Sequence, residues 1–108
     1  MNELLQHLIK TYKRVQINEG NEHTYLGMKL TFKTNGELNV DMSKYINELL
    51  NEYNITGTCN TPASNYLFDI MENSPLLDND NKELYHTITA KLLYLAKRAR
   101  PDILLAVI

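Results

Sequence analysis

The N-terminal part of the chain has the apolar spacing of an amphipathic helix. Between residues 3 and 14 the large apolar side chains recur at intervals that place them on one side of an α-helix. These side chains are Leu4, Leu5, Leu8, Ile9 and Tyr12. Lys10, Lys13 and Arg14 follow toward the C-terminal end, where positive charge interacts favourably with the helix dipole. We therefore predict a helix over residues 3–14.

Residues 23–42 show the alternation of β-strands instead. Every second side chain is apolar from position 26 to 32, and again from 38 to 42. Asn35-Gly36 lies between these runs, and this dipeptide is the strongest short signal for a two-residue hairpin turn. The pattern predicts one strand over residues 23–32, a turn at Asn35-Gly36 and a returning strand.

A second helix is predicted directly after the returning strand. Asp41 and Ser43 are both residue types that cap a helix N-terminus. The apolar side chains that follow fit one helical face, and they are Tyr45, Ile46, Leu49, Leu50 and Tyr53. Gly57 lies shortly beyond them, where a helix stop is expected. Residues 57–80 have little periodicity and many Asn, Ser and Thr, so we predict a long irregular connection there.

The last part of the chain is predicted to be helical. Asp80 and Glu83 have the spacing of a capping box, which places the start of a helix at Asp80. Its apolar stripe comprises Leu84, Tyr85, Ile88, Leu92, Leu95 and Ala96. Pro101 should end this helix and begin another, because proline disfavours helix at the residue before it and suits a first turn. Since the new helix reaches Ile108 without a cap, we expect a truncated α+β fold: a helix, a β-hairpin and then helices.

Composition narrows the class of protein. The chain has 108 residues and a net charge of −2, which argues against a free-standing nucleic-acid binder because such proteins are usually basic. Cys59 is the only cysteine, so an internal disulfide is impossible and a reducing, intracellular location is expected. We recognise no signal peptide and no apolar run long enough to span a bilayer, so no membrane partner is expected.

The sequence predicts no catalytic residue, no metal site and no cofactor in this chain. Residues 78–82 resemble the start of a calcium-binding loop, but Lys82 occupies a ligand position and the required glycine is absent. The three histidines lack metal-ligand spacing, and the four glycines stand too far apart for a phosphate-binding loop. Binding remains as a function. Gly27 inside the predicted strand marks either a bulge, a packing contact or the close approach of a ligand.

Several short motifs occur in a fixed order along the chain. They are Tyr25-Leu26-Gly27-Met28, Ser43-Lys44-Tyr45-Ile46, Thr61-Pro62, Leu93-Tyr94-Leu95 and Arg100-Pro101-Asp102-Ile103. In this order and spacing the chain resembles, from Leu4 to Ile108, the back half of the reverse transcriptase domain of copia-type LTR retrotransposons. It departs from that family at three places, where Met42 replaces a glutamine, Ala90-Lys91 a glycine-serine pair and Ala99 a threonine.

The resemblance implies an organisation and a set of binding residues. Residues 1–42 would be the end of the palm of a right-hand polymerase, and residues 43–108 its thumb-like helices. The residues implied in nucleic-acid binding are Tyr25, Leu26, Gly27 and Met28, which match the primer grip, and Lys44 and Tyr45, which match the start of the thumb. Lys44 would contact a phosphate of the template–primer duplex, a positioning role that does not read sequence.

The same resemblance implies partners and a location. The partners would be an RNA/DNA template–primer duplex, the rest of the polymerase domain and the ribonuclease H region. The metal-binding Tyr-Val-Asp-Asp turn of the family should precede Tyr25 and is not in this chain. Mg²⁺ is therefore expected only in the full-length polymerase, and the isolated chain is expected to be inactive. The location would be a cytoplasmic virus-like particle or the nucleus. Two alternatives stay open: a small independent α/β interaction module, and a non-functional transposon remnant.

Overall fold

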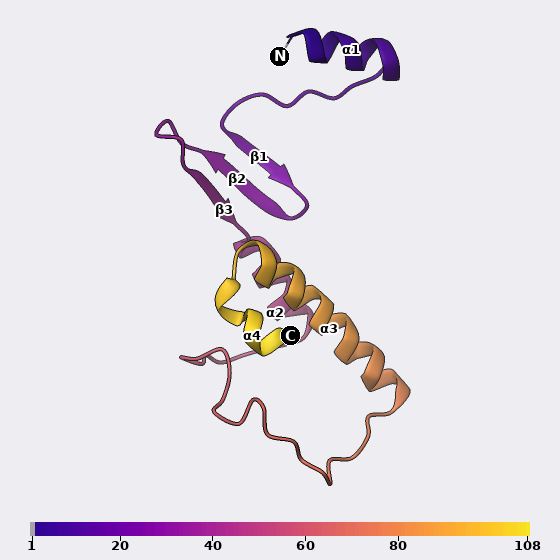
Figure 1. Cartoon of the computed structure of the whole chain (residues 1–108), viewed down its shortest axis with the longest axis vertical. Helices are drawn as coiled ribbons and strands as arrows, with labels where there is room; N and C mark the ends of the chain where they lie inside the picture. The colour runs from indigo at the N-terminus through magenta and orange to yellow at the C-terminus, as the bar shows by residue number, and fades with distance from the viewer. Residues whose placement is uncertain (1) are drawn as a thin grey trace.

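The computed structural model describes residues 2–108. Its first helix, α1 (Asn2–Tyr12), lies apart from the other elements (Figure 1). The helix predicted over residues 3–14 is thus confirmed, with an end two residues earlier. Its apolar stripe remains largely exposed, as Leu4 (57%) and Tyr12 (69%) show. The helix therefore gains little stability from packing within this chain.

Three antiparallel strands form the sheet, in the order β1-β2-β3. They are β1 (Glu22–Tyr25), β2 (Met28–Phe32) and β3 (Leu38–Asp41). The hairpin predicted around Asn35-Gly36 connects β2 to β3 and is confirmed, but its turn is not the predicted two-residue one. The Lys33 N–H donates to the Glu37 carbonyl at 2.8 Å, so the loop comprises the three residues 34–36, of which Gly36 has positive φ (86°). Cross-strand partners share a face of a sheet, so the register separates an apolar face from a polar one. The apolar face carries His23, Tyr25, Met28, Leu30, Phe32, Leu38 and Val40, and the polar face carries Glu22, Thr24, Lys29, Thr31, Asn39 and Asp41.

The single strand predicted over residues 23–32 is wrong, because the chain reverses within it. Leu26 and Gly27 have φ values of 48° and 80°, and they form a two-residue turn in which Tyr25 pairs with Met28. Positive φ at both central residues is the property of the type I′ turn, whose twist matches that of the flanking strands. Leucine is not a residue that this turn favours. The sequence therefore shows no turn signal at Leu26, and the apolar alternation that continues through it predicts a strand.

Three helices and a 3-10 turn form the other half of the molecule. Helix α2 (Ser43–Glu52) follows the sheet, and α3 (Asn79–Arg98) leads into a 3-10 turn, η1 (Pro101–Ile103), and α4 (Leu104–Val107). The break predicted at Pro101 is confirmed, and α4 returns against α3. The buried core comprises Met42, Leu49, Leu95 and Ala96.

The residues that begin α2 differ in part from the prediction. Met42, predicted as the last position of a strand, is the N-cap and makes no side-chain capping hydrogen bond. Its side chain is only 2% exposed, so burial explains an apolar residue at this position. Asp41 supplies the polar contact instead, because its Oδ1 accepts hydrogen bonds from the Ser43 N–H (2.8 Å) and hydroxyl (2.6 Å).

The N-cap of α3 is Asp78, and the prediction of Asp80 in that role is wrong. Asp78 has extended backbone angles, and its Oδ1 accepts a hydrogen bond from the Asn81 N–H at 2.8 Å. Asp80 lies inside the first turn, where a negative charge interacts favourably with the helix dipole. Both aspartates have the chemistry of a cap, and only the chain direction before the helix distinguishes them.

Replacing Asp78 with alanine is expected to destabilise the protein by about 1 kcal/mol, because the Asn81 N–H loses its acceptor. Asp80→Ala removes a carboxylate of the same type from the first turn of α3. It should cost roughly 0.5 kcal/mol or less, because only the interaction of that charge with the helix dipole is lost. Urea denaturation followed by circular dichroism measures both. Equal losses in the two variants would show that Asp78 does not act as the cap.

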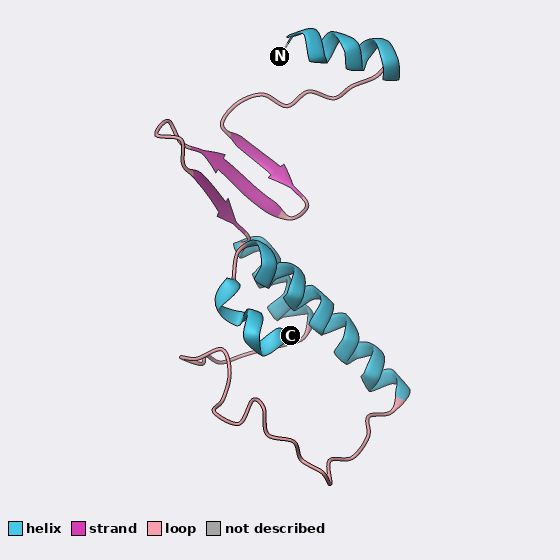
Figure 2. Cartoon of the chain, in the orientation of Figure 1, coloured by secondary structure: helices cyan, strands magenta, loops and turns pink. Residues whose placement is uncertain are grey.

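The molecule is elongated, with extents of 63 × 35 × 24 Å. Its radius of gyration is 20.1 Å, whereas a compact domain of this length has about 13 Å. Part of the difference comes from the connection between α2 and α3, which runs as an open loop below the helices (Figure 2). The irregular connection predicted over residues 57–80 is confirmed except at its end, because α3 already begins at Asn79. The connection exposes Tyr66 (72%), Phe68 (76%) and Ile70 (89%). None of the helices within residues 2–108 is long and apolar enough to cross a membrane.

Candidate nucleic-acid interface

The tip of the β1–β2 hairpin meets the helices at two tyrosines. The Tyr94 hydroxyl, on α3, donates a hydrogen bond to the carbonyl oxygen of Leu26. The Tyr45 ring, on α2, lies beside Gly27, where an added Cβ would be 3.7 Å from Tyr45 Cδ2. The two rings lie against each other, with centroids 5.5 Å apart and planes tilted by 42°. The hairpin tip, α2 and α3 therefore converge at this point.

Both tyrosines are held in place by further contacts. Tyr45 donates its hydroxyl hydrogen to the carbonyl of Lys91 at 3.2 Å, and burial raises the pKa of this phenol. The Arg98 guanidinium lies 3.7 Å from the centre of the Tyr94 ring, and Arg98 Nη1 donates to the Tyr94 carbonyl at 3.2 Å. Such stacking of a cation on an aromatic face is attractive. The Tyr45 phenol is therefore neutral at neutral pH, and the contacts orient both rings.

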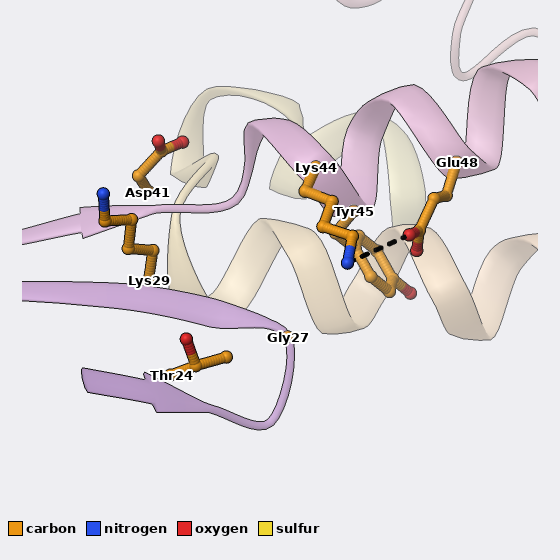
Figure 3. Close-up of a pocket in the computed structure, with 7 residues that line it drawn as sticks. All are labelled: Thr24, Gly27, Lys29, Asp41, Lys44, Tyr45 and Glu48. Carbon is orange, nitrogen blue, oxygen red and sulfur yellow. Dashed lines mark ion pairs between the residues drawn. The ribbon is translucent and has the colours of Figure 1, made fainter.

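An open hollow of about 310 Å³ lies between the hairpin tip and the first turn of α2. It is lined by Thr24, Gly27, Lys29, Asp41, Lys44, Tyr45 and Glu48. Figure 3 shows these side chains, with Lys44 and Tyr45 on α2 near the turn at Gly27. A second hollow of about 340 Å³ shares Gly27 and Tyr45 with the first and is also lined by Leu26 and Tyr94. We call the first hollow, which carries the charged side chains, the polar recess, and the second, which carries none, the apolar recess.

The charges around the polar recess are paired only weakly. The Lys44 side chain is 90% exposed, and its Nζ lies 3.9 Å from Glu48 Oε1. Lys29 Nζ lies 3.5 Å from a carboxylate oxygen of Glu22, again at the surface. Hydrogen bonds from Ser43 lower the pKa of Asp41, so this carboxylate is ionised at neutral pH. Exposed ion pairs of this kind contribute little to stability, so an anionic ligand can replace the glutamates as the partner of these lysines.

The six residues predicted from the resemblance do not all meet at one place. Gly27, Lys44 and Tyr45 line the polar recess, and Leu26 lines the apolar one. Tyr25 and Met28 flank the turn as cross-strand partners and line neither recess. The Tyr25 side chain is nevertheless 60% exposed on the apolar face of the sheet. The structure therefore groups four of the six residues and places the other two beside them.

Two contact residues lie outside the six that the resemblance implies in nucleic-acid binding. Tyr94 and Arg98 lie on α3, and Tyr94 is 68 positions from its hydrogen-bond partner Leu26. A helical stripe gives no indication of such a contact, because a tyrosine on a stripe is equally consistent with packing. The only local signal is the spacing of Tyr94 and Arg98, four residues apart on one helical face.

A second polar cluster joins α2 to α3 beyond the interface. Lys91 Nζ lies 2.7 Å from a Glu52 carboxylate oxygen and donates to the Tyr53 hydroxyl at 3.0 Å. The same ammonium lies 5.0 Å from the centre of the Tyr53 ring. The hydrogen bond to Glu52 is the largest of the effects that raise the pKa of Lys91. This cluster therefore holds the two helices together at the end of α2.

Within residues 2–108, no group of three or more His, Cys, Asp or Glu side chains is arranged to hold a metal ion. Comparisons of the chain with protein-family models, with curated proteins and with solved structures found no match. The site combines an exposed apolar tip at Leu26, the two lysines of the polar recess and the paired rings of Tyr45 and Tyr94.

Proposed function

We propose that this chain is the template–primer-gripping part of a copia-type reverse transcriptase and that it binds the backbone of an RNA/DNA duplex. The hairpin tip and Lys44 make the contacts, and the catalytic carboxylates of the polymerase lie outside this part. The observation that carries the proposal is the conformation of Leu26. It is an aliphatic residue at positive φ (48°) whose side chain is 58% exposed.

Neither conformation nor packing within the chain explains a leucine at position 26. The left-handed region costs a residue with a Cβ about 1–2 kcal/mol, and glycine or asparagine would avoid this cost. Burial does not compensate, because more than half of the side chain faces solvent. Residues held in unfavourable backbone conformations concentrate at binding sites. A contact between Leu26 and a partner accounts for the residue.

The surroundings of Leu26 favour a nucleic-acid backbone as that partner. Sugar carbons and phosphate oxygens alternate along such a backbone. The tip presents the apolar Leu26 side chain in one recess, and the recess on the other side of Gly27 carries Lys29 and Lys44 together with two carboxylates. Phosphate contacts position a protein without reading sequence, so little sequence preference is expected. Since the net charge is −2, binding should be weak, in the range of non-specific dissociation constants of about 10⁻⁴–10⁻⁶ M.

Replacing Lys44 with glutamine is expected to weaken binding to a labelled RNA/DNA duplex several-fold at low salt. The slope of log affinity against log salt should fall by roughly 0.9, the value for one lost phosphate contact. Fluorescence anisotropy at several salt concentrations measures both quantities. Lys33→Gln is the matched control. Lys33 also pairs with a glutamate four residues later, but it lies in the hairpin between β2 and β3, outside the two recesses.

Equal effects of Lys44→Gln and Lys33→Gln would reject the assigned contact, since only net charge would then matter. No binding by the wild-type chain at low salt would reject the proposal itself. That result would favour the alternative of a protein-interaction module. The alternative is supported by the exposed side chains of the α2–α3 connection, among them Tyr66, Phe68 and Ile70.

A further inference from the structure

We propose that Tyr94 is a positioning residue for the nucleic-acid interface. Its hydroxyl fastens the turn at Leu26-Gly27 to α3 and so fixes where the exposed Leu26 side chain lies relative to Lys44. This inference rests on the proposed function, because it assigns the residue that organises the same site. The hydrogen bond from the Tyr94 hydroxyl to the Leu26 carbonyl carries it.

The hydrogen bond is placed where it can control the turn. Leu26 has a φ of 48°, and an aliphatic residue does not keep this conformation without support from its surroundings. The hydrogen bond that the Leu26 carbonyl accepts from the Tyr94 hydroxyl restrains the peptide unit between Leu26 and Gly27. The Tyr45 ring beside Gly27 restrains the turn from the α2 side. Together the two contacts join the hairpin tip to both helices.

Tyr94 is itself prepared for this role. Its side chain is half-buried, with the Tyr45 ring on one side and the Arg98 guanidinium 3.7 Å from its ring centre. An oriented phenol loses less rotational freedom when it donates a hydrogen bond than a mobile one does. Arg98 is therefore a support for Tyr94, and its own contact with the Tyr94 carbonyl keeps it over the ring.

The size of the effect follows from the exposure of the bond. A single neutral hydrogen bond near the surface contributes a factor of about 2 to 12 in an equilibrium constant. The docked arrangement of the hairpin tip is thus favoured only modestly. Its loss should weaken duplex binding by at most this factor, because the affinity follows the fraction of molecules whose tip is docked and presents Leu26 and Lys44 together.

Tyr94→Phe tests the proposal by removing the hydroxyl and keeping the ring. We expect the affinity for a labelled RNA/DNA duplex to fall measurably, by at most about 12-fold, with an unchanged salt slope because the lysines remain. In nuclear magnetic resonance spectra, the Gly27 amide signal should move toward its position in an unfolded chain. Tyr53→Phe is the matched control, since its hydroxyl contacts Lys91 and lies outside the interface. This control should leave affinity and the Gly27 signal unchanged.

An unmoved Gly27 signal with wild-type affinity in Tyr94→Phe would overturn the proposal. A lower salt slope would also overturn it, because Tyr94 would then act through the charge contacts. If Tyr94→Phe does not fold, Arg98→Met replaces it, with a smaller shift of the Gly27 signal expected and no shift as the contradicting result. If the wild-type chain binds no duplex, the proposed function fails, while the Gly27 signal still decides whether Tyr94 holds the turn.

Discussion

Leu95→Ala is expected to destabilise the protein by about 2–5 kcal/mol and to unfold much of its helical half under mild conditions. The Leu95 side chain is 5% exposed and lies in a core whose other buried members are Met42, Leu49 and Ala96. Domains of about this length have only about 5–15 kcal/mol of stability in total. With so small a core, the surrounding helices have few other apolar contacts that can compensate for the cavity.

Urea denaturation followed by far-ultraviolet circular dichroism measures this loss. Leu105→Ala is the matched control, because it is the same chemical change at a side chain that is 65% exposed on α4. Its effect should stay within about 0.5 kcal/mol. If the two variants were equally stable, the packing of α3 at Leu95 would be wrong.

Gly27→Val is expected to disrupt the β1–β2 turn and to reduce duplex binding by about 5- to 140-fold. Gly27 has a φ of 80°, a conformation that a β-branched residue adopts only at a cost of about 1–3 kcal/mol. The first added carbon would fit, since it would lie 3.7 Å from Tyr45 Cδ2. The cost therefore comes from the backbone, and about 1.4 kcal/mol already corresponds to a factor of ten.

Gly27→Asn separates this backbone effect from the effect of adding a side chain. Asparagine tolerates positive φ, so this variant should retain the turn and most of the affinity. Fluorescence anisotropy with the labelled duplex compares the two variants, and circular dichroism confirms that the helices persist. Equal binding by Gly27→Val and wild-type protein would remove the hairpin tip from the interface.

The helices were predictable because their signals are local. The stripes of α1, α2 and α3 repeat at helical spacing, and Pro101 restricts its own neighbours whatever the rest of the chain does. The hairpin between β2 and β3 was predictable for the same reason, since asparagine and glycine both favour turns and Gly36 has positive φ (86°). These features depend on residues within one or two turns of each other.

The turn at Leu26-Gly27 was not predictable, because leucine favours a strand and the alternation of apolar residues continues through it. The cap of α3 was misplaced by two residues, since Asp78 and Asp80 have the same chemistry and differ only in the direction of the preceding chain. The partners of Lys91 were not predictable either, because its ammonium group reaches Glu52 and Tyr53 at the end of α2, 39 and 38 positions away.

The amino-acid sequence alone therefore determined the helices, the second hairpin, the irregular connection and the α+β class of this protein. Only the tertiary structure showed that the first hairpin bends at Leu26 and that Tyr94, from 68 positions away, contacts its tip. The physical reason is the range of the interactions. Helical periodicity and turn propensity act between near neighbours, whereas a hydrogen bond between distant residues forms only when folding has brought them together.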